Sequence, residues 1–135
     1  MDTTCDCLRL PRDERASSTA RRWLERIAAQ LPEKMRSDVF LLTHELVINA
    51  VRHSDGDFLW VSAEILRGAV RVKVTDEGGF SEPAMLPELP YSTSGRGLRW
   101  VAALSDGWGV EHGQGRSVWF QIDRKPDDAA PAKAS

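Results

Sequence analysis

The stretch LLTHELVINAVRHS, residues 41–54, decides how the rest of the chain is arranged. Read as a helix, it places Leu42, Leu46 and Ala50 at the spacing of one apolar stripe that faces a core. The pattern extends backwards, and turn-forming residues follow it, so the helix is expected to span residues 33–53. This segment therefore predicts a long helix that packs one side against the centre of the fold.

A column of polar side chains lies directly beside that stripe. Glu45, Asn49 and His53 are four residues apart, so they stack on one face of the predicted helix. Polar groups beside a core cost free energy unless something there interacts with them. A solvated helix face is the plain alternative, and the segments VKVTDEGG (72–79) and SGRGL (94–98) weigh against it.

Composition limits the classes of protein that the chain can represent. Its 135 residues are 41% hydrophobic and 28% charged, which is typical of a single globular domain. The net charge of −2 creates no general attraction for nucleic acid or anionic lipid, so neither is an expected partner. No apolar run approaches the roughly 20 residues that span a bilayer, and the expected compartment is the cytoplasm. Cys5 and Cys7 are too few for a typical zinc site and are expected to be reduced thiols.

Residue periodicity predicts the elements in the first half of the chain. A short edge strand is expected at 4–10, followed by an amphipathic helix at 12–31. After the central helix, the period switches to two over 58–66 and again over 70–75, which predicts a hairpin. Continuing that alternation by one step directs Asp76 inward, towards the core.

A long aperiodic segment divides the two halves of the chain. Residues 80–94 contain three prolines, and a loop of this length is either disordered or a functional lid. A helix is expected after it at 98–104, with Leu98, Val101 and Ala102 on its buried side.

Two more strands are expected to close the domain, at 107–111 and 117–122, and the tail at 125–135 to be disordered. The domain organisation is thus a strand or arm at 1–11, a folded domain at 12–124 and the tail. Antiparallel hairpins with helices gathered elsewhere predict an α+β fold. We expect a two-layer α/β sandwich, whose mixed, mostly antiparallel sheet is covered on one face by helices.

Several of these residues suit the recognition of a nucleotide. A buried carboxylate at Asp76 would accept a hydrogen bond from the exocyclic amine of adenine and repel the keto group of guanine. Glycines at Gly78, Gly95 and Gly97 allow the backbone to approach a base or a phosphate, because no Cβ intervenes. Free amides at the start of the following helix can bind phosphate oxygens.

The polar column on the central helix supplies the remaining chemistry. An amide oxygen at Asn49 is a hard ligand suited to Mg²⁺, which would bridge the phosphates. Glu45, one turn away, lies where a general base could accept the proton of a hydroxyl group or a water.

Four sequence boxes, in this order, resemble those of the histidine-kinase-like (GHKL, or Bergerat) ATPases, and most closely those of the anti-sigma-factor serine kinase branch. HELVINAVRHS (44–54) is similar to the asparagine box, and VTDEGG (74–79) to the adenine-binding box. SGRGL (94–98) is similar to the second glycine box, and GRSVWF (115–120) to the closing strand motif. The resemblance covers roughly residues 10–123 and implies the Bergerat fold.

Carried over by position, the resemblance implies a role for each matching residue. Glu45 would be the catalytic base and Asn49 the Mg²⁺ ligand, while Asp76 would bind the adenine amine with help from Ser117 through water. The other implied nucleotide-binding residues are Gly78 under the base, Gly95, Arg96, Gly97 and Leu98 around the phosphates, and Arg52 and His53 on the phosphate side. The implied cofactors are ATP and Mg²⁺.

The chain departs from the family pattern at several places. Phe80 stands where the adenine box usually has another glycine, and it puts closure of the short, proline-rich lid in doubt. Ser117 replaces the commoner threonine but keeps the hydroxyl. Arg52 and His53 have a second interpretation, in which their positive charge faces the C-terminal end of the helix dipole.

The resemblance implies an anti-sigma regulatory serine/threonine kinase. It would phosphorylate an anti-sigma factor antagonist and bind a sigma factor on a separate face, and it would form a homodimer through the N-terminal strand and first helix. The alternative is a nucleotide-dependent protein-binding switch of the same fold without turnover. A degenerate domain that binds no nucleotide is the remaining possibility.

Overall fold

The structure is a computed structural model that describes residues 4–78, 93–113 and 115–124. Within these residues the elements follow in the order β1 (Thr4–Pro11), α1 (Ala16–Ala28), α2 (Glu33–His53), β2 (Phe58–Leu66), β3 (Ala69–Asp76), α3 (Thr93–Leu104), β4 (Gly107–His112) and β5 (Arg116–Asp123). Most of the predicted lid, including Phe80, and the predicted tail at 125–135 lie outside the described residues.

The strands form one five-stranded sheet in the order β1-β2-β3-β5-β4. Every neighbouring pair in this sheet is antiparallel, so the described strands include no parallel pair and the expectation of a mixed sheet is wrong. For β2–β3 and β4–β5 the physical reason is that short connections join the strands, and a short connection can link only antiparallel neighbours. The predicted α+β class is confirmed, and β1 lies at the edge of the sheet as expected.

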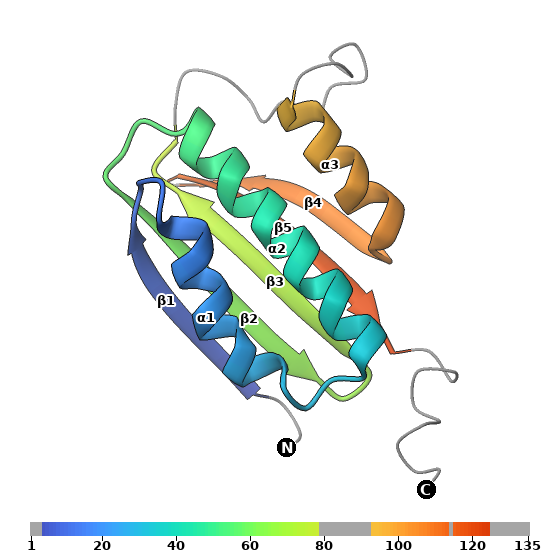
Figure 1. Cartoon of the computed structure of the whole chain (residues 1–135). Coiled ribbons are helices and arrows are strands. Elements are labelled where there is room, and N and C mark those ends of the chain that lie inside the picture. Colours follow the sequence, from blue (N-terminus) through green and yellow to red (C-terminus); the bar gives the residue numbers. More distant parts are fainter. Residues whose placement is uncertain (1–3, 79–92, 114, 125–135) are drawn as a thin grey trace, which may run out of the picture.

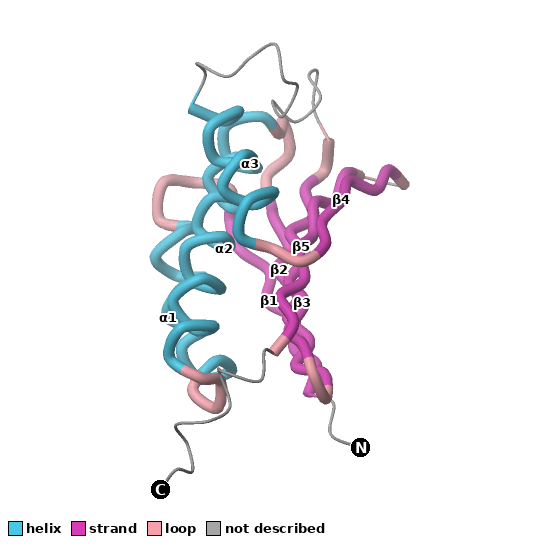
Figure 2. Tube along the Cα trace, turned by 90° about the vertical axis from the view of Figure 1, so that its right-hand side faces the viewer, coloured by secondary structure: helices cyan, strands magenta, loops and turns pink. Residues whose placement is uncertain are grey.

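The three described helices cover one face of this sheet. Figure 1 shows α2 crossing the middle of the sheet, with α1 on one side and α3 on the other. In the perpendicular view of Figure 2, the helices form one layer and the strands form a second. The predicted two-layer sandwich is therefore confirmed.

The apolar stripe of α2 forms the centre of the core. Leu42, Leu46 and Ala50 are buried as predicted, and α2 contacts α1, α3, β3 and β5. The bounds of α2 are those that the sequence predicts, because its apolar spacing persists up to the turn residues that follow His53.

Alternation of side chains along the strands supplies the other half of the core. In β2 and β3 every second residue is buried, as the period of two predicts. The buried residues are Leu59, Val61, Ala63 and Ile65 in β2 and Val70, Val72 and Val74 in β3. Phe120 in β5 completes this face and is fully buried.

Some element ends differ from those predicted. Residues 12–15 form a turn before α1, where the carboxylate of Asp13 accepts a hydrogen bond of 2.8 Å from the backbone N–H of Arg15. The helix α3 begins at Thr93, earlier than expected, so the glycine-rich segment lies inside its first turns. On α3 Val101 is buried as predicted, but Ala102 is exposed, and its assignment to the buried side is wrong.

Among the described residues, no helix is both long and apolar enough to cross a membrane.

The contrast between two neighbouring leucines of α2 tests this packing. Leu42 is fully buried whereas Leu41 is 37% exposed. Leu42→Ala should lower the free energy of unfolding by about 2–5 kcal/mol, because it removes apolar contacts and leaves a cavity. Leu41→Ala, the same change one position away, should alter it by less than about 0.5 kcal/mol. Urea denaturation of both variants measures the difference, and equal losses would contradict the orientation of α2.

Candidate functional site

The ends of three elements meet at one end of the sandwich. His53 is the last residue of α2, Asp76 the last of β3 and Arg116 the first of β5. In Figure 1 these ends lie together at the upper left. Asp76 and Arg116 are direct partners across the β3–β5 ladder. Their side chains are only 4% and 5% exposed, so two opposite charges are buried at this point.

The guanidinium of Arg116 connects all three ends. Its Nη2 donates to Oδ2 of Asp76 at 3.2 Å and to the backbone carbonyl of His53, also at 3.2 Å. A buried charge requires a partner of opposite sign and further hydrogen bonds to offset its lost hydration. The carboxylate and the helix-terminal carbonyl provide both for Arg116.

Gly78 holds the other oxygen of Asp76. The Gly78 N–H donates to Asp76 Oδ1 at 2.6 Å, and the Gly78 carbonyl accepts from the Asp55 N–H at 2.8 Å. Gly78 has a φ of 92°, a backbone conformation that residues with a Cβ rarely adopt. This glycine therefore turns the chain at the end of β3 and ties it to the residues that follow α2.

The alternation of residues in the strands explains this arrangement. The prediction that Asp76 points inward is confirmed. Sequence reasoning missed Arg116, although the signal was present. Val118, Phe120 and Ile122 alternate on the inner face, and extending that pattern back by one step directs Arg116 inward as well.

Ser117 lies on the opposite face of the sheet from Asp76. Its hydroxyl contacts Thr75 Oγ1 at 2.7 Å, and Thr75 is its direct cross-strand partner. Neighbouring residues in a strand face opposite sides, so the Ser117 hydroxyl points away from Asp76, and its predicted assistance to Asp76 through a water stays a prediction. Arg116 occupies the position beside Asp76 instead.

Asn49 places a buried hydrogen-bond acceptor near the end of α2 that Arg116 contacts. It lies on α2 one helical turn before His53 and is 4% exposed. Within the described part of the chain, its Oδ1 accepts no hydrogen bond. Such a buried, unsatisfied oxygen costs free energy, so it is available to accept a hydrogen bond or to bind a cation. Glu45, a further turn back, is half-buried.

The glycine-rich segment lies on the neighbouring helix. Gly95, Arg96, Gly97 and Leu98 fall within the first two turns of α3, which packs along α2 (Figure 1). The first backbone N–H groups of a helix have no acceptor within the helix. The start of α3 therefore offers backbone N–H groups as hydrogen-bond donors.

The imidazole of His53 is affected by the charges around it. Burial lowers its pKa, and the positive charges of Arg116 and Arg52 lower it further, while Asp76 opposes them. Neutral His53 is thus favoured between the two arginines, and Arg52 itself is exposed at the end of α2.

The residues present fit a magnesium ion only in part. Among the described residues, no group of three or more His, Cys, Asp or Glu side chains could hold a metal. The amide oxygen of Asn49 is nevertheless a suitable Mg²⁺ ligand, and it is unsatisfied in the structure. Asn49 would then supply one ligand of a Mg²⁺ ion, and the phosphates of a nucleotide would supply others.

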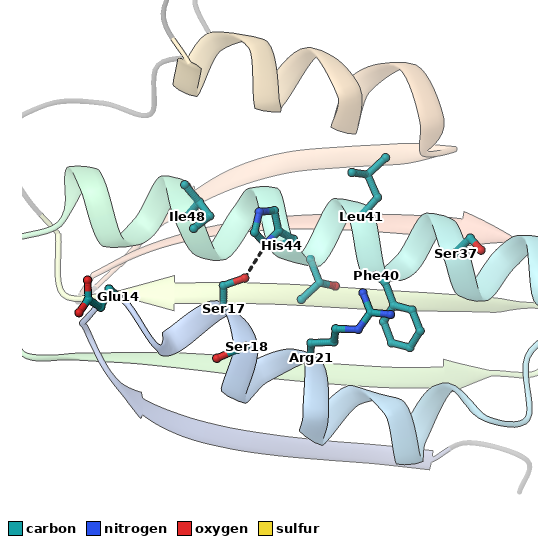
Figure 3. Close-up of a pocket in the computed structure, with 10 residues that line it drawn as sticks. Glu14, Ser17, Ser18, Arg21, Ser37, Phe40, Leu41, His44 and Ile48 are labelled. Carbon is teal, nitrogen blue, oxygen red and sulfur yellow. Dashed lines mark hydrogen bonds between the residues drawn. The ribbon is translucent and has the colours of Figure 1, made fainter.

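A separate groove lies between α1 and α2, with a volume of about 660 Å³. Figure 3 shows its lining, in which the hydroxyl of Ser17 forms a hydrogen bond with Nδ1 of His44. Leu41 and Ile48 contribute apolar surface from α2. None of the predicted nucleotide-binding residues lines this groove, so it is distinct from the Asp76 end of the sandwich.

The lowered pKa of His53 predicts a pH dependence of stability. The unfolded chain, whose histidine has a pKa of about 6.5, takes up a proton at a higher pH than the folded chain does. The stability contributed by neutral His53 is therefore complete above that value and is lost as pH falls through the lower folded-state pKa. Urea denaturation between about pH 7.5 and pH 5.5 should show a steeper loss for the wild type than for His53→Gln. An equal loss of unfolding free energy in both proteins would contradict the lowered pKa of His53.

Gly115 provides a test of how closely the strands approach at this site. A Cβ at Gly115 would overlap the backbone carbonyl oxygen of Asp76, whereas a Cβ at Gly113 would meet open space. Gly115→Ala should lower the free energy of unfolding by about 1–3 kcal/mol, because the backbone must shift. Gly113→Ala, in the same turn, should have little effect. Equal effects in thermal denaturation would mean that the contact between Gly115 and Asp76 is absent.

Comparison with known proteins identifies the family of the chain. The sequence model of the family described as "Histidine kinase-like ATPase domain" matches residues 10–122. A search of curated proteins found no match.

Solved structures share the fold. The RsbU and RsbW domains of Rv1364c from Mycobacterium tuberculosis are 22% identical, with a TM-score of 0.65, covering 87% of this chain and 32% of that one. The histidine kinase domain of the Erythrobacter litoralis blue-light activated kinase EL346 is 20% identical, with a TM-score of 0.58 and coverage of 91% and 65%. The Acinetobacter baumannii histidine kinase AdeS is 15% identical, with a TM-score of 0.52 and coverage of 93% and 70%.

The chain thus spans about a third of the first structure and just under two thirds of the second. At these identities the likeness is one of fold. The match of the family model extends over most of the sequence. The chain belongs to the family of histidine kinase-like (GHKL) ATPase domains.

Proposed function

We propose that the chain is an ATP-dependent anti-sigma serine/threonine kinase. It would transfer the γ-phosphoryl group of ATP to a serine of a small anti-sigma factor antagonist, and bind a sigma factor on another face. Membership of the histidine kinase-like ATPase family supports nucleotide binding. The four sequence boxes that resemble the anti-sigma branch support the finer assignment, together with the fold that the chain shares with the RsbW-containing structure.

One observation carries the proposal. A buried carboxylate, Asp76, and a buried amide oxygen with no partner among the described residues, Asn49, lie at the same end of the sandwich. The connection is continuous, because Asn49 is one turn from His53, whose carbonyl shares the Arg116 guanidinium with Asp76. Both oxygens are hydrogen-bond or metal acceptors beside glycine-rich backbone, which suits a base at one end and phosphates at the other.

Asp76 would bind the base. Its two oxygens provide about four lone-pair positions, and among the described residues Oδ1 accepts from the Gly78 N–H and Oδ2 from Arg116. The carboxylate therefore retains the capacity to accept a hydrogen bond from the exocyclic amine of adenine. Gly78, held by its backbone bonds, would lie under the base.

The phosphates would lie between α2 and the start of α3. The backbone amides of Gly95 and Arg96 belong to the first turn of α3, so they suit phosphate oxygens, and Gly97 and Leu98 follow in the second turn. Arg52 and His53 would face the phosphates from α2. Mg²⁺, held by Asn49, would neutralise the charge that develops on the phosphates during transfer.

Glu45 would act as the catalytic base. The substrate hydroxyl oxygen forms a bond to the γ-phosphorus, the bond to the β,γ-bridging oxygen breaks, and ADP leaves with that oxygen. The hydroxyl proton passes to the carboxylate of Glu45, which is half-buried one turn from Asn49. We also propose that the chain forms a homodimer through β1 and α1, and that it acts in the cytoplasm.

Replacing Glu45 by its uncharged analogue tests the proposal. Glu45→Gln should slow transfer of labelled γ-phosphate to a purified candidate antagonist by about 10²–10⁴-fold, because glutamine cannot accept the proton. Binding of ADP, measured by calorimetry, should stay within about threefold, since Glu45 does not contact the base. Glu33→Gln, the same change in the first turn of α2, is the matched control and should leave transfer unchanged.

Two results would contradict the kinase. If the wild type binds ADP but transfers phosphate to no candidate partner, the chain is a nucleotide-dependent protein-binding switch. If it binds neither ADP nor ATP, it is a degenerate member of the family.

A further inference from the structure

The groove between α1 and α2 combines a cationic side chain with apolar walls. Its volume of about 660 Å³ lies within the roughly 300–1,000 Å³ that small-molecule sites occupy. Phe40, Leu41 and Ile48 line it from α2, and Arg21 lines it from α1. Sites for small molecules typically have this composition, in which a few polar groups orient a ligand on apolar surface.

The guanidinium of Arg21 lies on an aromatic ring at this groove. Its Cζ atom is 4.4 Å from the centre of the Phe40 ring, and its Nε donates to Glu25 at 3.4 Å. Figure 3 shows the guanidinium beside the Phe40 ring. Among the described residues these are the partners of Arg21, so its two terminal Nη groups retain their N–H donors. Two such donors, held side by side, match the two oxygens of a carboxylate.

Thr43 adds a second polar group to the same lining. It is only 2% exposed, and its hydroxyl has no hydrogen-bond partner within the part of the chain that the structure describes. A buried hydroxyl without a partner costs free energy, and valine would have nearly the same shape without this cost. A ligand oxygen bound at this wall of the groove would satisfy the hydroxyl.

The charges in the lining favour an anion at one end of the groove. Arg21 lies beside Phe40, whereas Glu14 lies at the opposite end (Figure 3). The ion pair between Arg21 and Glu25 has side chains that are 60% and 55% exposed, so water screens it strongly. Arg21 can therefore bind a further anion through its terminal nitrogens.

We propose that the groove between α1 and α2 binds a small amphipathic carboxylate. The carboxylate group would bind the Nη groups of Arg21 and the hydroxyl of Thr43, and the apolar part of the ligand would lie along Leu41 and Ile48. The predicted nucleotide-binding residues take no part in this site. The inference therefore goes beyond the proposed function and does not depend on it.

Titration of the wild-type protein with octanoate tests the inference. Octanoate joins a carboxylate to an apolar chain, and 1-octanol carries a similar chain with a neutral head group. Backbone amide chemical shifts, followed by NMR, give both the affinity and the location of binding. We expect octanoate to bind with a dissociation constant below about 1 mM, about tenfold lower than that of 1-octanol, with the shifts centred on α1 and α2.

Single substitutions then attribute the affinity to the two polar groups. Arg21→Met keeps an apolar side chain but removes the donors, so octanoate should bind about tenfold more weakly while 1-octanol binds as before. Thr43→Val, which replaces the hydroxyl by a methyl group, should weaken octanoate binding by about three- to fivefold. Arg22→Met, at the next and also exposed position of α1 but outside the groove lining, is the matched control and should change neither affinity.

Several results would overturn the inference. Absence of octanoate binding, or equal affinities for octanoate and 1-octanol, would show that the groove recognises no carboxylate. Shifts centred away from α1 and α2 would place the binding elsewhere. If groove amides shift with protein concentration before any ligand is added, a second copy of the chain covers the groove. Should either groove variant fail to fold, the comparison of the two ligands on the wild type decides the question.

Discussion

The packing of the α2 apolar stripe on the inner face of the sheet is the constraint on which the remaining structure depends. Leu42, Leu46 and Ala50 are buried on one side of the helix, and the spacing of a helix then fixes every other position on it. Asn49 adjoins the stripe, so burying the stripe also buries this amide. The free-energy cost of the unsatisfied Asn49 oxygen thus follows from burial of the neighbouring apolar residues. Their contacts together stabilise the fold by more than this cost.

Side-chain alternation in the strands likewise fixes which polar residues are buried at one end of the core. In β3 and β5 the inner face is apolar over most of its length and changes to Asp76 and Arg116 at one end. These two residues are cross-strand partners, so the register that pairs the apolar residues also pairs the charges. A shift of β5 by one residue against β3 would turn Arg116 and the apolar residues of β5 outward while Asp76 stayed inside, which makes the pairing and the core mutually dependent.

Periodicity predicted the parts of the fold that depend on regular burial. The bounds of α2 and β2 and the inward direction of Asp76 follow from spacing alone, because each repeats over several turns or residues. The start of α3 was less predictable, since its first turn contains two glycines, which carry no apolar signal. Ala102 was misplaced because alanine is common on either side of a helix.

The candidate site was predicted only where its residues belong to such patterns. Asn49 and Asp76 could be found from their positions beside apolar repeats. Ser117 was chosen by its residue type within a motif, whereas the alternation of β5 directs its neighbour Arg116 inward. Arginine is usually exposed, so the residue type alone predicts that Arg116 lies at the surface. Its burial becomes possible because the carboxylate of Asp76 is its partner.

The choice of arginine at this position has a physical reason that separates it from lysine. A planar guanidinium can bond two acceptors in different directions and stays charged when buried, whereas a buried ammonium readily loses its proton. Here the two acceptors are the Asp76 carboxylate and the carbonyl of His53, where the negative end of the α2 dipole adds to the attraction. These two bonds therefore fix the orientation of the Asp76 carboxylate and tie the end of α2 to the ends of β3 and β5.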